Sequence, residues 1–330
     1  MRPLLLKGHE RPLTHIKFNA DGDLLFSTAK DTRPTLWWAS NGERVGTYDG
    51  HSGAVWSCDV FWDSTRLLTG SADNTARLWD VESGHELYRW SLRAPVRSVG
   101  VAPGCRLLHL ASSKLMGQDS NIYLYALNTG GEWTQQQPEP VRVLCGHTAT
   151  ITAVQWYNTA EFIVSASEDG TVRKWNVETG QEMECVKRHR KPAMDLKFSK
   201  DCQLFMTGAS DSTAVLWDTH SMQTVRTFAL DRPLNAVDLS PLLPHAVVGG
   251  GQEASEVTTT TGKAGKFSAT LLHLAYGEAI GSVKGHFGPI NCLSFTPDGQ
   301  GFASGGEDGY VRLHRFDEEY FTRGDNELAW

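Results

Sequence analysis

Long apolar runs are absent from this sequence. The N-terminus, MRPLLLKGHE, holds only three consecutive leucines, far short of the core of a secretory signal. No segment approaches the roughly 18 apolar residues that a transmembrane helix needs. We therefore expect a soluble protein of the cytoplasm.

A surplus of positive charge is also missing. Lysine and arginine number 31 against 38 aspartates and glutamates, so the net charge is -7. Because nucleic-acid-binding domains usually carry a basic surface, we expect little direct RNA binding. The one dense basic run, residues 187–191, is interpreted as a solvated loop between two repeats; a contact to a phosphopeptide or RNA is the alternative.

The residue patterns of metal, nucleotide and disulfide sites are absent. The six cysteines are scattered without a C-x-x-C spacing, which favours buried free thiols over zinc ligands or disulfides. In the glycine-rich stretch 249–267, Gly262-Lys263-Ala264 lacks the spacing and the hydroxyl of a phosphate-binding loop. We expect no cofactor and no metal, and we interpret this stretch as an extruded loop.

Against these absences stands one strong internal repeat. Five times a histidine is followed 22 residues later by an aspartate, and 6 residues after that by a tryptophan or histidine. The sets are His9/Asp31/Trp37, His51/Asp73/Trp79, His147/Asp169/Trp175, His189/Asp211/Trp217 and His286/Asp308/His314. A glycine precedes the histidine in four of them, and Arg188 takes its place in the other. A Gly-His opening and a Trp-Asp or Trp-Asn close at this period indicate the blades of a WD40 β-propeller.

Each unit contains four short alternating segments, which predicts an all-β fold with four strands a blade. His51 and His147 are 96 residues apart and His189 and His286 are 97 apart, so each gap holds one further, degenerate unit and the total is seven blades. The last unit lacks a fourth strand, whereas residues 2–7 have the pattern of one. We expect a single seven-bladed propeller over residues 1–317, closed by the N-terminal strand in blade seven, with an acidic and aromatic tail at 318–330.

Within each set we expect a structural hydrogen-bond network that includes a serine of the second strand. Two networks are predicted to be complete, His51/Ser71/Asp73/Trp79 and His147/Ser167/Asp169/Trp175. The other three are predicted to be incomplete, because Ala29, Ala209 and Gly306 replace the serine. A Ser-His-Asp grouping also suggests a catalytic triad, but catalysis needs one activated nucleophile beside an oxyanion site rather than several partial copies. We therefore expect no enzymatic activity.

The stretches that do not repeat carry a family resemblance. LLLKGHERPLTHIKFNADGDLLFSTAKD, NGERVGTYDGHSGAVW, LTGSADNTARLWD, GGGQEASEVTTT with GKF, and VKGHFGPINCLSFTPDGQGFASGGEDGYVRLHRFD closely resemble the i subunit of eukaryotic translation initiation factor three. The resemblance runs from residue 1 to about residue 321 and departs mainly in 117–140 and in the last ten residues.

This resemblance implies a non-catalytic scaffold subunit of a complex that binds the small ribosomal subunit. Such a subunit supports assembly of the preinitiation complex, mRNA recruitment and scanning. Its partners would be the b subunit, through a C-terminal helical segment of that subunit, and the g subunit, through its N-terminal region.

Our own hypothesis for the partner surface is the flank of blades five and six, where an apolar strip with charged rims would suit an amphipathic helix. Its residues are Asp218, Asp231, Arg232, Leu234, Leu242 and Leu243. The alternative is that these leucines belong to the core of a strand. For the function as a whole, the alternative is a WD40 peptide-binding adaptor of signalling or ubiquitination, which is disfavoured because no further domain is appended.

Overall fold

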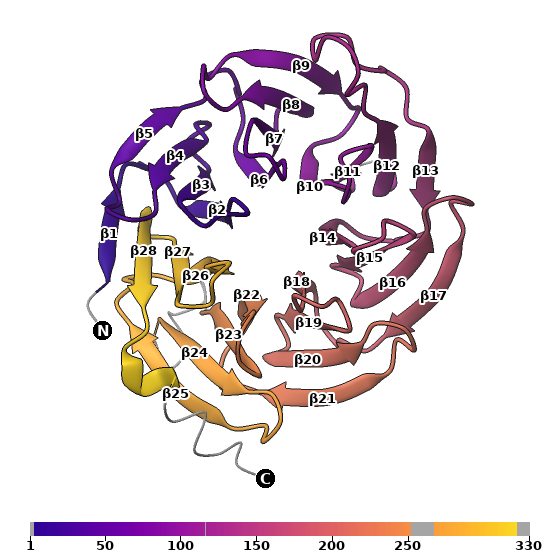
Figure 1. The fold of residues 1–330 in the computed structure, drawn as a ribbon. Helices are drawn as coiled ribbons and strands as arrows, with labels where there is room; N and C mark the ends of the chain where they lie inside the picture. Colours follow the sequence, from indigo (N-terminus) through magenta and orange to yellow (C-terminus); the bar gives the residue numbers. More distant parts are fainter. Residues whose placement is uncertain (1–2, 116, 252–266, 322–330) are drawn as a thin grey trace.

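A computed structural model describes residues 3–115, 117–251 and 267–321 of the chain. Their 28 strands form seven four-stranded antiparallel sheets, arranged as blades around a central axis (Figure 1). In six blades the strands follow chain order from the centre outward. The predicted all-β, seven-bladed propeller is confirmed.

The strand bounds repeat closely from blade to blade. Blades 1 and 2 contain β2 Leu13–Phe18, β3 Leu24–Ala29, β4 Thr35–Trp38, β5 Arg44–Thr47, β6 Val55–Val60, β7 Arg66–Ser71, β8 Thr75–Asp80 and β9 Glu86–Ser91. Blades 3 and 4 contain β10 Val96–Val101, β11 Leu107–Ser112, β12 Asn121–Ala126, β13 Arg142–Cys145, β14 Ile151–Trp156, β15 Phe162–Ser167, β16 Thr171–Asn176 and β17 Glu182–Lys187. Blades 5 and 6 contain β18 Ala193–Phe198, β19 Leu204–Ala209, β20 Thr213–Asp218, β21 Thr224–Ala229, β22 Leu234–Leu239, β23 His245–Gly250, β24 Ser268–His273 and β25 Ala279–Lys284.

Blade 7 joins the two ends of the chain. Its strands β26 Ile290–Phe295, β27 Gly301–Gly306 and β28 Tyr310–Arg315 are followed in the sheet by β1 Leu4–Lys7. β1 is antiparallel to β28, with Leu4 opposite Leu313 and Lys7 opposite Tyr310. The predicted closure by the N-terminal strand is confirmed, and it leaves the ring without an open blade.

The turn between the second and third strands needs one left-handed residue directly after the repeat aspartate. That position is held by Thr32, Asn74, Gly170, Ser212 and Gly309, with φ between 65° and 77°. Glycine and asparagine adopt this conformation at little cost, whereas the β-branched Thr32 is strained there. The Asp-Asn and Asp-Gly pairs of the sequence therefore mark the same turn in different blades.

The hydrophobic core lies between neighbouring blades rather than in one central mass. A typical cluster joins Phe26, Leu36 and Tyr48 of blade 1 to Leu67 and Trp79 of blade 2. Each sheet therefore buries both faces against its neighbours, and the innermost strands leave a narrow space along the axis. Within the described ranges, no helix has the length and apolar character that crossing a bilayer requires.

Two segments outside the repeat pack on the ring. In the polar segment after β12, Trp133 lies edge-on against Phe61 of blade 2, with 5.5 Å between the ring centroids, and Gln136 is buried. Residues 318–321 form a helical turn in which Tyr320 stacks on Phe316 at 3.9 Å and shares a hydrogen bond with His245. Residues 252–266, most of the expected extruded loop, and 322–330 of the tail lie outside the described residues.

The cysteine expectation needs correction. Cys58 and Cys292 are buried, but Cys145 and Cys185 are exposed. Both exposed thiols sit on fourth strands, whose outward faces meet solvent.

Candidate functional site

The ring has two ends along its axis, and the connections between strands of each blade lie at one end or the other. The connections between blades and the turns between second and third strands share one end, which we call the histidine end because all five repeat histidines lie there. The turns between first and second and between third and fourth strands lie at the opposite end. This division follows from the antiparallel order of each sheet.

In blade 2 three side chains and one carboxylate form a continuous chain of hydrogen bonds. The indole N–H of Trp79 donates to Thr69 Oγ1 at 2.8 Å, so the hydroxyl of Thr69 is left to donate to His51 Nε2, also at 2.8 Å. His51 then carries its proton on Nδ1 and donates it to Asp73 Oδ2 at 2.8 Å. Both ring nitrogens of His51 therefore have a hydrogen-bond partner.

The same arrangement recurs in the other four histidine blades. The second-strand hydroxyl belongs to Ser27, Ser165, Thr207 and Ser304, each 2.7 or 2.8 Å from the histidine Nε2. Asp31, Asp169 and Asp308 lie 2.7 to 3.1 Å from the histidine Nδ1, whereas Asp211 lies 3.5 Å from that of His189. Trp37, Trp175 and Trp217 donate to the hydroxyl, and in blade 7 His314 Nε2 lies 3.3 Å from Ser304 Oγ.

The structure corrects the predicted serines. Ser71 and Ser167 lie two residues beyond the hydroxyls that contact the histidines, on the same face of the strand but further along it. Ser71 Oγ donates to Gly53 O and accepts from Asp73 N, so it holds the turn instead of the imidazole. Ala29, Ala209 and Gly306 occupy that turn position in the other blades, and the three sets predicted to be incomplete have their hydroxyls after all.

The carboxylates of these sets are held in the charged form. Burial raises the pKa of Asp73, but the hydrogen bonds from His51 and Thr75 outweigh it and leave that pKa well below its ordinary value. The balance is the same for Asp169, with His147 and Thr171 as donors, and for Asp308, with His286 as the main donor. The hydroxyls of Thr69 and Ser165 are fully buried, which leaves no room for a substrate beside them.

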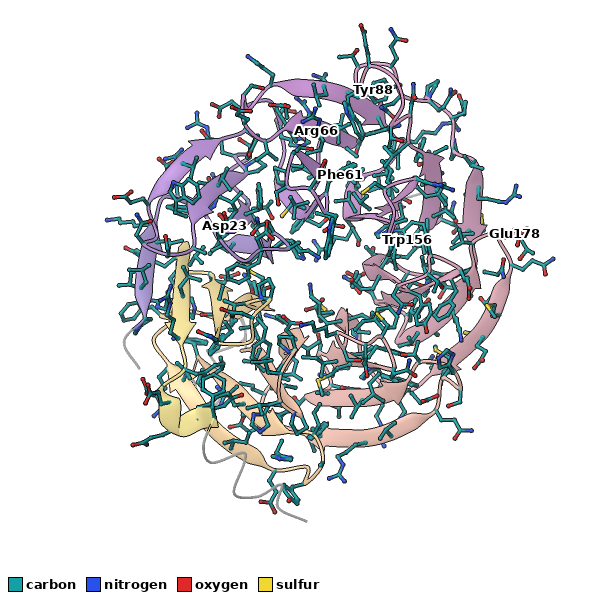
Figure 2. All side chains as sticks on the ribbon, in the orientation of Figure 1. Asp23, Phe61, Arg66, Tyr88, Trp156 and Glu178 are labelled. Atoms are coloured by element: carbon teal, nitrogen blue, oxygen red, sulfur yellow. The ribbon has the colours of Figure 1, made fainter. Side chains whose placement is uncertain are left out.

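Charged side chains along the axis were missed by the sequence reasoning. The innermost strands surround a cavity of about 350 Å³, and Figure 2 shows their side chains projecting into the middle of the ring. Lys17 pairs there with Asp59 at 3.2 Å, and this carboxylate raises the pKa of the lysine. Burial raises the pKa of Asp195 to about 6.

These axial aspartates connect neighbouring blades. Asp59 accepts a hydrogen bond from Val101 N at 2.9 Å, and Asp195 accepts one from Val237 N at 3.1 Å. Asp238 accepts one from Phe295 N at 2.6 Å. The signal in the sequence was an aspartate within a first strand, but only the ring brings it to the next blade.

The predicted partner strip is not one surface. Asp231 and Arg232 precede β22 at the histidine end, whereas Leu242 and Leu243 follow β22 at the opposite end. Leu234 is 1% exposed and belongs to the core between blades 5 and 6, as the alternative interpretation had it.

Asp218 closes β20 at the same end as Leu242. There it accepts hydrogen bonds from the N–H and hydroxyl of Ser221. These bonds cap a turn and lower the pKa of Asp218. Of the six residues, Leu242 is the apolar side chain that is clearly open to solvent, at 56% exposed.

Taken together, the fold and its hydrogen-bond sets define a protein of the seven-bladed WD40 propeller class. The particular family follows from comparison with known proteins. The EIF3I family model matches residues 1–324, and the chain belongs to that family.

Curated relatives extend this match over almost the full length of both chains. A protein of Nematostella vectensis named eukaryotic translation initiation factor 3 subunit I is 46% identical over 320 residues, which cover 97% of this chain and 98% of that protein. Proteins with the same name from Danio rerio and Bombyx mori are 44% and 42% identical over 321 residues. These alignments cover 97% of this chain and 98% and 97% of the two relatives.

Proposed function

We propose that this chain is a non-catalytic scaffold subunit of the translation initiation factor 3 complex in the cytoplasm. In that role it binds partner subunits of the b and g type and supports assembly of the preinitiation complex, mRNA recruitment and scanning. The observation that carries this proposal is the end-to-end match to proteins named as subunit I of that factor. Contact with the small ribosomal subunit then runs through the complex.

The non-catalytic part of the proposal rests on the geometry of the histidine sets. Each buried hydroxyl is already engaged by an indole or imidazole and by a histidine, so its oxygen has no free approach. The carboxylate behind each histidine also holds a backbone N–H, as Asp73 holds that of Ser52. Such fully satisfied networks stabilise a fold, whereas a nucleophile must reach its substrate.

For the helical segment of the b-type partner, we place the docking surface at the opposite end of blade 6, around Leu242. This side chain lies over Gly299 of blade 7, where a Cβ would meet it, so an exposed leucine spans the junction of two blades. An exposed apolar anchor of this kind suits the apolar face of an amphipathic helix.

Affinity purification of the tagged full-length chain from cytosol tests the function. Initiation factor subunits and ribosomal proteins are the expected companions; recovery of ubiquitin ligase or kinase components in their place would favour the adaptor alternative. Leu242→Lys should reduce recovery of the b subunit about tenfold or more, as expected for an interface anchor.

Asp231→Lys at the histidine end is the matched control for Leu242→Lys, and it should leave recovery unchanged. Both variants should melt like the wild type, because neither side chain is buried. Equal loss of the b subunit in both variants would mean that the docking surface lies elsewhere.

A further inference from the structure

The connection between blades 4 and 5 carries a dense positive charge at the histidine end. The side chains of Lys187, Arg188, Arg190 and Lys191 are exposed, while His189 between them is buried. His189 is held by Thr207 at 2.8 Å and Thr213 at 3.2 Å, so it anchors the connection to the blade. The four charges therefore stand on a rigid turn rather than on a loose loop.

Blades 2 and 4 carry a neutralised charge beside the histidine. In blade 2 the third-strand Arg77 pairs with Glu86 of the fourth strand at 2.5 Å, and in blade 4 Arg173 pairs with Glu182 at 2.6 Å. The glycine before the histidine belongs to this arrangement, because a Cβ on Gly50 would collide with Arg77 Nη1 and the ring of Trp79.

Blade 5 departs from that arrangement at three positions together. Val215 stands opposite Thr207 where Arg77 stands opposite Thr69. Thr224 stands opposite Trp217 where Glu86 stands opposite Trp79. At the third position, Arg188 stands before His189 where the other four histidine blades have a glycine.

Blade 5 therefore has neither the arginine nor the glutamate of that pair beside its basic run. Arg188 Nη2 donates to the neutral Thr227 Oγ1 at 3.0 Å. Among the described residues, none of the four basic side chains is within ion-pair distance of an aspartate or glutamate. The nearby Asp211 is already used, since Oδ2 accepts from Arg190 N and Oδ1 from Thr213.

We propose that these four side chains form a docking site for an acidic, carboxylate-rich segment of a partner protein. Arginine presents paired N–H groups that match a carboxylate, and the flanking lysines add charge without fixed geometry. The site lies at the end of the ring opposite to Leu242, so it can be occupied while a helix is bound there.

Protein, rather than nucleic acid, is the occupant that the charges favour. Nucleic-acid affinity grows with the number of phosphates contacted along a track, and the chain as a whole carries a net charge of -7. The dense run is confined to one connection: on the same end, blade 6 offers the Asp231–Arg232 ion pair, and the start of blade 4 offers Thr148, whose carbonyl accepts from the single Lys114. A short acidic segment needs only a few such contacts.

Binding of a short fluorescein-labelled polyglutamate peptide to the full-length chain tests the site. Lys187→Glu with Lys191→Glu should weaken binding roughly tenfold or more, since reversed charges repel the segment. Lys7→Glu with Arg11→Glu is the matched control: these residues stand two positions before and after His9, as the test pair stands around His189, and the net charge changes equally.

The control variant should bind nearly as well as the wild type, and both variants should melt like it. Equal weakening in both variants would contradict the proposed site, because the effect would then come from the net charge of the whole protein. Failure of the wild type to bind the peptide would overturn it as well. An oligouridine RNA could instead bind more tightly than the peptide and lose binding only in the blade 5 variant. The site would then be assigned to nucleic acid rather than to a protein segment. No other subunit is present in this assay, so its outcome is separate from that of the proposed function.

Discussion

Blades 2 and 6 fill the same space with opposite chemistry. Blade 2 uses His51, Thr69 and Trp79 as a hydrogen-bonded chain, whereas the corresponding residues of blade 6 are Leu230, Val248 and Leu272, which pack together in one apolar cluster. Blade 3 makes the same exchange with Leu92, Leu110 and Tyr125.

In blades 3 and 6 the members of the set change together rather than one at a time. A mixed set would bury an unpaired donor or acceptor, which costs about 1–3 kcal/mol. The degenerate units are therefore not damaged copies of the repeat. They are complete apolar versions of it.

The largest effect is expected from removing the tryptophan of the polar blade. Trp79→Ala should lower the free energy of unfolding by about 3–5 kcal/mol, because a fully buried ring is lost and the Thr69 hydroxyl loses a donor. Leu272→Ala should cost about 2–4 kcal/mol, since only apolar packing is lost. Chemical denaturation measures both, and a Trp79→Ala midpoint equal to wild type would remove the structural role assigned to the set.

A pH titration sharpens the comparison in blade 7, where a histidine replaces the tryptophan. Burial lowers the pKa of His314 from 6.5 to about 4. As pH falls from 6.5 towards 4, the unfolded chain binds this proton and the folded chain does not, so stability decreases through that window, by about 3 kcal/mol in total.

His314→Trp restores the indole of the other blades and removes this proton. The variant should therefore lose less stability than the wild type between about pH 7 and pH 5. Unfolding followed at both pH values gives the difference. Identical pH dependence in the two proteins would mean that His314 is not the group that titrates.

The smallest effect is expected from exchanging single members between the two kinds of blade. Thr69→Val in blade 2 and Val248→Thr in blade 6 should each cost about 1–3 kcal/mol, because both exchanges leave a buried polar group unpaired. Thr69→Ser, which keeps the hydroxyl, is the control and should cost less. Should Ser71→Ala prove more destabilising than Thr69→Val, the serine predicted from the sequence would be the true member of the set.

The repeat frame was predictable because its spacings follow from geometry that each blade shares. A histidine before the first strand and an aspartate after the second must be a constant number of residues apart if they are to meet. The hydroxyl was assigned wrongly because Thr69 and Ser71 point to the same face of one strand, and local sequence does not say which of the two stands opposite the imidazole. Leu234 and Leu242 posed the same difficulty, since both follow a turn signal and only one is buried.

The sequence by itself determined the number of blades, the class of fold, the closing strand and the family, because all of these depend on periodicity and identity along the chain. Only the tertiary structure decided which groups of different blades and strands meet. Asp238 reaches a backbone N–H 57 residues away, and Arg188 donates to the hydroxyl of Thr227, 39 residues further along the chain. Such contacts arise when separate strands are brought side by side in the ring, and no local pattern encodes that distance.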